Sequence, residues 1–165
     1  MKVVFSRAVE LTEVNGKAIA VDINENNVAF GSEEHVSNIK SGEKVIRTAY
    51  FLKRRRLQSK PRLNEKTLLA KYRGREHRRI EQIYHKLANQ IIEEAKELKA
   101  STIALEELTN IRKRINRSKE LNGRLNRWSF RKLQNIIEYK ARLAGLNVKY
   151  FNAKGTSSLC PKCRG

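Results

Sequence analysis

The sequence is poor in cysteine, in aspartate and in long apolar runs. Of its 165 residues two are cysteines, three are histidines and one, Asp22, is an aspartate. Two cysteines three residues apart exclude a framework of structural disulfides and indicate a reduced thiol pair. The apolar runs are only a few residues long, which excludes a transmembrane helix, and the first residues lack the apolar segment of a signal peptide. We therefore expect a cytoplasmic protein with no membrane partner.

Motifs of several enzyme classes are also absent. The chain has no Gly-rich phosphate loop, no Gly-x-Ser-x-Gly elbow and no His-Glu-x-x-His pair. The chemistry of NTPases and of zinc proteases is therefore unsupported, and we expect no small-molecule substrate.

Positive charge is what the sequence has in excess. Lysine and arginine number 36 against 17 acidic residues, a formal net charge of +19. Hydrophobic residues make up 39% of the chain, enough for a core and too many for a disordered polycation. A folded domain this basic usually has a polyanionic partner. Nucleic acid is the first candidate and an acidic membrane surface the second, and of the two we expect nucleic acid.

The excess charge lies in two blocks. Residues 44–86 carry a net +12 and residues 112–142 a net +9, whereas residues 1–43 and 87–111 are each slightly acidic. Arginine, which dominates these blocks, suits bidentate contacts to phosphate. A charge run is often only a solvated face, but this density favours nucleic-acid binding. The predicted contact residues are Lys53, Arg54, Arg55, Arg56, Arg73, Arg75, Arg78, Arg79, Arg112, Lys113, Arg114, Arg117, Arg124 and Arg127.

Hydrophobic periodicity predicts an α/β fold with one mixed sheet. Antiparallel strands come first, and parallel strands follow the helical crossovers. A long apolar stripe from Ile80 to Leu98 predicts a long helix, and Ser129 and Gly145 are the expected cap residues of a later one. Trp128 is expected in the core. The predicted elements are strands at 17–23, 28–32 and 35–40, helices at 45–57 and 64–99, a strand at 101–108, a loop or frayed helix at 109–127, a helix after Ser129 and a strand at 147–151.

Two carboxylates end apolar strands. Asp22 lies within Ala-Ile-Ala-Val-Asp-Ile, and Glu106 shares a strand face with Ala104. Each residue alone is explained as a strand-end side chain, with Asp22 capping the following turn. On adjacent strands, about 4.8 Å apart, the two side chains share a divalent cation, and hard oxygen ligands favour Mg²⁺ or Mn²⁺. A third ligand is expected, because two carboxylates are few ligands for a metal site.

Cys160 and Cys163 have the spacing of half a tetrahedral zinc site. The other half is missing, because no cysteine or histidine follows them. A redox pair is the alternative, but such a pair stands at the first turn of a helix that follows a strand, whereas the stretch around Cys160 and Cys163 is expected to be a loop. We expect zinc to bind weakly, if at all, at this half site.

Taken together, these stretches resemble the OrfB/TnpB proteins of insertion sequences, relatives of the type V CRISPR effector nucleases. The stretch AIAVDINENNVAF is similar to the family's first RuvC-type motif, and HKLANQIIEEAKELKASTIALEELTNIR is similar to the second. The stretch NRWSFRKLQNIIEYKARLAGLNVKYFNAKGTSSLCPKCRG is similar to the family's helix, strand and zinc-ribbon start. The three occur in the family's order.

The resemblance implies an RNase-H-like nuclease domain over 1–155, with a basic helical insertion at about 44–100 and the first half of a zinc ribbon at 156–165. Asp22 and Glu106 take the places of two catalytic, metal-binding residues, and Cys160 and Cys163 those of a first zinc pair. The implied activity is Mg²⁺- or Mn²⁺-dependent cleavage of DNA. It is guided by RNA in the family's characterised relatives, so DNA and a guide RNA are the expected partners.

The chain also departs from the family's pattern. The N-terminal recognition region, the second cysteine pair and the third catalytic aspartate have no counterpart, since Asp22 is the only aspartate. We therefore expect a piece of a longer protein, or a decayed reading frame, with little or no cleavage by this chain alone. One alternative is a non-catalytic nucleic-acid-binding remnant. Another is a ribosome- or RNA-associated basic protein, which has no need to bring Asp22 and Glu106 together.

Overall fold

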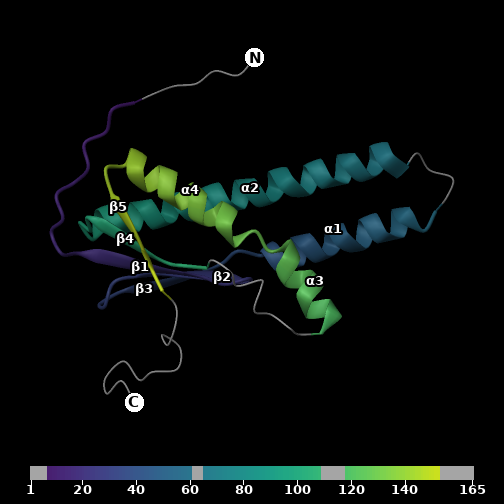
Figure 1. The fold of residues 1–165 in the computed structure, drawn as a ribbon, viewed down its shortest axis with the longest axis horizontal. Helices are drawn as coiled ribbons and strands as arrows, with labels where there is room; N and C mark the ends of the chain where they lie inside the picture. Colours follow the sequence, from purple (N-terminus) through teal and green to yellow (C-terminus); the bar gives the residue numbers. More distant parts are fainter. Residues whose placement is uncertain (1–6, 61–64, 109–117, 153–165) are drawn as a thin grey trace.

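A five-stranded mixed sheet with helices packed on it forms the body of the computed structural model, which describes residues 7–60, 65–108 and 118–152. Figure 1 shows the elements in space. In chain order they are β1 (Ala18–Ile23), β2 (Asn27–Gly31), β3 (Val36–Lys40), α1 (Glu43–Gln58), α2 (Glu65–Glu97), β4 (Thr102–Glu106), α3 (Lys119–Arg127), α4 (Phe130–Leu143) and β5 (Asn147–Phe151).

The strands lie in the order β3-β2-β1-β4-β5. Strand β2 pairs antiparallel with both β1 and β3, and β4 pairs parallel with both β1 and β5. The change of direction follows from the connections, because short turns join the first three strands and long helices precede β4 and β5. The predicted mixed α/β sheet is confirmed.

Helices α2 and α4 cover one face of this sheet (Figure 1). Along β1 the side chains alternate strictly: Ile19, Val21 and Ile23 are buried, whereas Ala18, Ala20 and Asp22 are exposed. The apolar stripe of α2, from Ile80 to Ala95, is buried against the inward face of the sheet together with α4. Asp22 therefore lies on the side of β1 that faces away from the core.

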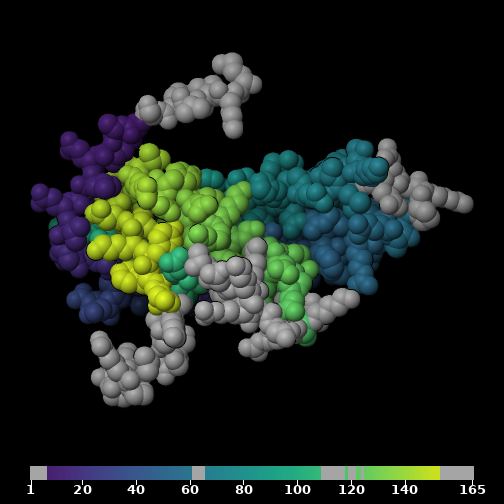
Figure 2. All heavy atoms as spheres, viewed as in Figure 1, coloured from purple at the N-terminus to yellow at the C-terminus, as the bar shows by residue number. Residues whose placement is uncertain are grey.

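Helices α1 and α2 form a hairpin whose outer part extends beyond the sheet, seen as the blue and teal atoms in Figure 2. Four charged side chains hold the inner part together. Arg47 pairs with Glu43 and Glu76, and Arg54 pairs with Glu76. Burial acts to lower the pKa of Arg47, but Glu43 and Tyr84 outweigh it, so that the pKa is raised. The hairpin is thus joined to itself by buried ion pairs.

In the segment before α4 the structure forms one of the two alternatives that the sequence left open. Residues 119–127, expected as a loop or frayed helix, form helix α3; polar positions outnumber apolar ones there, so that the periodicity is weak. Ser129 is the N-cap of α4 as predicted, but its side chain makes no capping hydrogen bond. Its hydroxyl oxygen accepts a hydrogen bond of 3.0 Å from Arg47 instead. Trp128 is buried against Phe130, as expected.

The end of α4 is a Schellman motif. Gly145 has a φ of +79°, and the amides of Gly145 and Leu146 donate to the carbonyls of Arg142 and Ala141. Glycine reaches this left-handed conformation at little cost. The motif turns the chain directly into β5. No helix among the described residues is long and apolar enough to cross a membrane.

Candidate functional site

Asp22 and Glu106 lie at the same end of two neighbouring parallel strands. The register pairs Ala20 with Ala104 and Val21 with Leu105, so that the next residues along the two strands are Asp22 and Glu106. Both alternate with buried neighbours, which places both on the outer face of the sheet. Residues far apart in sequence therefore form one carboxylate pair.

The two carboxylates influence each other. Partial burial raises the pKa of Glu106, and the negative charge of Asp22 raises it further. This electrostatic coupling is the sign of two acids close together, and a cation between them relieves the repulsion. The pair therefore has the electrostatics of a cation site.

Glu106 is also fixed through its main chain. Gln134 of α4 is fully buried, and its Nε2 donates a hydrogen bond of 2.7 Å to the carbonyl oxygen of Glu106. Arg131 lies 3.5 Å from the Oε1 of the same glutamine. This buried amide links α4 to the end of β4. Sequence reasoning missed it, because a glutamine at an inward position of an amphipathic helix gives no signal of its partner.

Asp22 has a more open environment. Its Oδ2 accepts a hydrogen bond of 2.8 Å from the side-chain amide of Asn24, in the turn that follows β1. Beside it runs a shallow depression of about 360 Å³, bordered by Ala18, Ala20, Ala29 and Ala104. Small side chains here leave the carboxylate accessible from outside.

The donor set suits Mg²⁺ or Mn²⁺ in chemistry but is small. Two carboxylates offer hard oxygen ligands, which these ions prefer. Within 7–60, 65–108 and 118–152, no three His, Cys, Asp or Glu side chains gather where they could hold a metal ion. The pair therefore fits as part of a metal site. Cys160 and Cys163, the predicted half zinc site, lie outside the described residues.

The predicted nucleic-acid contacts fall into three groups. Most of those on the hairpin are exposed: Lys53, Arg55, Arg56, Arg73, Arg75, Arg78 and Arg79. Two others are engaged inside the protein: Arg54 pairs with Glu76 between α1 and α2, and Arg127 of α3 lies 4.4 Å from the ring centre of Phe51. The remaining ones fall in undescribed parts of the chain, where Arg112, Lys113, Arg114, Arg117 and the side chain of Arg124 are found.

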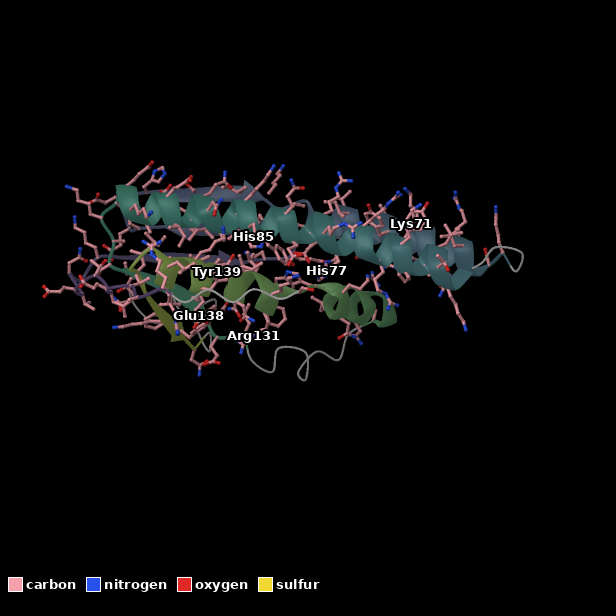
Figure 3. The ribbon with its side chains drawn as sticks, turned by 90° about the horizontal axis from the view of Figure 1, so that it is seen from above. Lys71, His77, His85, Arg131, Glu138 and Tyr139 are labelled. Atoms are coloured by element: carbon pink, nitrogen blue, oxygen red, sulfur yellow. The ribbon has the colours of Figure 1, made fainter. Side chains whose placement is uncertain are left out.

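A polar seam joins α2 to α4 on the surface. Lys132 donates to Glu81 at 2.9 Å and lies 3.1 Å from the Nε2 of His77. Figure 3 shows His85 and Tyr139 facing each other across the same seam, with the tyrosine hydroxyl 3.3 Å from Nδ1. His77 and His85 are therefore packing partners of α4, whereas His35 lies 3.4 Å from Glu94 of α2.

Comparison with known proteins gives related sequences and folds. A family model described as the Cas12f1-like TNB domain matches residues 130–164, a range that includes α4 and β5. A TnpB-like protein of Methanocaldococcus jannaschii is 40% identical over 159 residues, which cover 88% of this chain and 56% of the relative. The CRISPR-associated endodeoxyribonuclease Cas12f2 of a Micrarchaeota archaeon is 36% identical over 87 residues, 51% of this chain and 16% of the relative.

Two cryo-EM structures have a similar fold. A chain of a Cas12f1–sgRNA–target DNA complex matches with a TM-score of 0.69 and 19% identity, over 95% of this chain and 41% of that one. A chain of a CRISPR–Cas12f ternary complex matches with a TM-score of 0.72 and 18% identity, over 98% of this chain and 32% of that one. The chain thus spans about half the length of the first relative and less of the others.

Proposed function

Because this chain belongs to the OrfB/TnpB family, which is related to the type V CRISPR effectors, we propose that it forms the nuclease body of a nucleic-acid-cleaving protein. Residues 1–155 would be an RNase-H-like unit with a helical insertion, and 156–165 the start of a zinc ribbon. The substrate would be DNA, with a guide RNA as a second partner. The mixed sheet with helices is the fold shared with the Cas12f chains.

One observation supports this proposal above the others: the parallel pairing of β1 with β4 puts Asp22 and Glu106 side by side at the carboxyl ends of these two strands. In the proposed reaction both carboxylates would hold Mg²⁺ or Mn²⁺ through their oxygens. A metal ion held there would lower the pKa of a bound water molecule and stabilise the leaving oxygen. Gln134 keeps the main chain of Glu106 in place, and Asn24 orients the carboxylate of Asp22.

The hairpin supplies the binding surface in this proposal. Its exposed arginines and lysines contact phosphates, while α1 begins beside the turn that follows β1: the amide of Ser41 donates to the carbonyl of Asn26 at 2.9 Å. A nucleic-acid strand bound along the hairpin is therefore led toward the end of β1 that carries Asp22.

The experiment is a titration of the chain with Mn²⁺, followed by paramagnetic broadening of backbone NMR signals. We expect broadening at the ends of β1 and β4 in the wild type, and its loss in both D22N and E106Q. E93Q, which removes an exposed carboxylate of α2, is the matched control. Broadening that persists in both site variants would contradict the proposal.

Cleavage is tested separately, with Mn²⁺ or Mg²⁺ and single- and double-stranded DNA. Weak or absent cleavage by this chain is expected, since at least one further ligand is needed. Strong cleavage that D22N abolishes would overturn the expectation of an incomplete site. DNA binding without any Mn²⁺ broadening at β1 and β4 would favour the non-catalytic remnant.

A further inference from the structure

Over residues 44–60 and 66–80, the outer part of the hairpin carries positive charge that no exposed carboxylate in those two ranges offsets. Within 44–60 and 66–80 the sequence has a single acidic residue, Glu76, and this residue is buried between Arg47 and Arg54. Ten cationic side chains point to solvent instead: Lys53, Arg55, Arg56, Lys60, Lys66, Lys71, Arg73, Arg75, Arg78 and Arg79. Figure 3 marks Lys71 on this outer part of α2. Folding has thus placed the counter-charge inside and left the cations outside.

Two of these cations lie over tyrosine rings. Tyr50 of α1 and Tyr72 of α2 are half-buried and face each other with ring centres 6.5 Å apart. The Nζ of Lys53 is 6.0 Å from the ring centre of Tyr50 and 5.8 Å from that of Tyr72, and the guanidinium of Arg75 is 5.9 Å from Tyr72. We refer to Tyr50, Lys53, Tyr72 and Arg75 as the tyrosine–cation cluster.

A ring orders a cation without neutralising it. The attraction between a cation and a π face restrains the long side chain, but the ring has no net charge to cancel that of the cation. Among the described residues neither Lys53 nor Arg75 has a carboxylate partner, whereas the adjacent Arg54 is paired with Glu76. The cluster therefore offers two full positive charges in restrained positions, so that less conformational entropy is lost when an anion binds.

We propose that the tyrosine–cation cluster is a preorganised contact for the phosphodiester backbone of nucleic acid, with Lys53 and Arg75 as the two phosphate ligands. The proposal rests on the proposed nucleic-acid-binding function and adds to it which cations of the basic surface matter most. A row of phosphates suits the geometry, because the exposed cations of α2 extend from Lys66 to Arg79, over about 20 Å of helix.

The test measures binding of a single-stranded DNA oligonucleotide by fluorescence anisotropy over a series of salt concentrations. Each phosphate contact contributes about 0.7 to the slope of log affinity against log salt for a single strand. K53Q/R75Q should therefore lower the slope by about 1.4. K86Q/K96Q removes two exposed lysines from the other end of α2, changes the net charge equally, and should leave the slope close to that of the wild type.

The contribution of the tyrosine rings to DNA binding is measured with a second pair of variants. Y72L keeps both cations but removes the ring they share, so affinity should fall by about fivefold while the salt slope stays unchanged. Y72F restores the ring and should regain most of the lost affinity. Circular dichroism melting of each variant shows whether the hairpin is still folded, and only folded variants are compared.

The outcomes separate the two proposals. A wild type that binds no DNA overturns the proposed function together with this inference. A wild type that binds, with K53Q/R75Q no different from K86Q/K96Q, overturns the cluster alone. Equal affinities of Y72L and Y72F overturn the role of the ring. Binding to anionic lipid vesicles but not to DNA, lost in K53Q/R75Q, would assign the cluster to membranes and overturn the inference.

Discussion

Neighbouring residues of one basic run have different roles in this structure. Lys53 is exposed beside two tyrosines, whereas Arg54 is an interior ion-pair partner of Glu76. The sequence predicted both as nucleic-acid contacts, because charge alone does not tell which side of a helix is buried. The pairing of Asp22 with Glu106 was accessible from the sequence, since both follow the alternation of apolar strands. The partner of Gln134 was not, because one residue cannot indicate a contact with a distant main-chain carbonyl.

The bond from Gln134 to Glu106 makes a prediction at the level of one side chain. Q134L has a similar volume but removes the buried amide that donates to the carbonyl of Glu106, which should cost about 1–3 kcal/mol of stability. It should also weaken Mn²⁺ binding and speed hydrogen exchange at the end of β4. N135A, at an exposed position of the same helix, is the control. If Q134L binds Mn²⁺ as the wild type does, Gln134 has only a packing role.

Tyr150 predicts a pH dependence. Burial of its ring, together with a 2.8 Å hydrogen bond to Glu138, raises the pKa of Tyr150 to about 12. The unfolded chain releases this proton near pH 10, so the stabilisation is complete below about pH 10 and is lost as pH rises to about 12. Y150F should be less stable than the wild type by about 1 kcal/mol near neutral pH.

The check on Tyr150 is denaturant unfolding of wild type and Y150F across alkaline pH. The difference in free energy of unfolding should shrink between about pH 10 and 12. Tyr84, whose pKa burial also raises, is present in both proteins and cancels in this difference. A difference that stays constant across the window would show that Tyr150 is not the titrating group.

At the level of elements, a glycine that follows one helix and a glycine inside another should respond in opposite ways to an added methyl group. Gly145 adopts a φ of +79°, and an added Cβ there meets the carbonyl oxygen of Glu10 at 3.0 Å. G145A should therefore destabilise the protein by about 1–2 kcal/mol. Gly74 lies within α2, where an added Cβ meets only the flexible end of Arg78 at 3.4 Å. G74A should stabilise by up to about 1 kcal/mol. Thermal melting measures both, and equal shifts would contradict the argument.

The ion pairs between α1 and α2 give a second prediction for an element. E76Q leaves Arg47 and Arg54 without the buried carboxylate that both contact, and breaking a buried pair on one side costs about 3 kcal/mol or more. Urea unfolding of E76Q against E93Q measures the effect, because Glu93 is exposed on the same helix. Equal stability of the two variants would mean that the hairpin is held by its apolar contacts alone.

The elements themselves were largely predictable. Strands and long helices followed from period-two and period-3.6 patterns with buried stripes such as Ile80 to Ala95, and the mixed sheet followed from the lengths of the connections. Helix α3 was left open between a loop and a frayed helix, because its residues are mainly polar. The structural role of Ser129 was only half predicted, since Arg47 is distant in sequence and takes the hydroxyl that would otherwise cap α4.

For the whole molecule, metal binding should increase the free energy of unfolding. Mn²⁺ at about five times its dissociation constant should add about 1 kcal/mol, or about 2–4 °C in melting temperature for a chain of this size. D22N should abolish the increase. D22N should also stabilise the metal-free protein slightly, because the charge that raises the pKa of Glu106 is removed. A metal-induced increase that persists in D22N would place the ion elsewhere.

The parallel pairing of β1 with β4 has a consequence for the kinetics of folding. These two strands are separated in sequence by β2, β3, α1 and α2. They therefore pair only after a long stretch of chain has been organised, which is a slow event of high contact order. A nascent or partly folded chain already exposes its cationic helices, but its two acids are still apart. In the proposed function, this late assembly of the carboxylate pair would separate in time the binding of nucleic acid from the binding of metal ions.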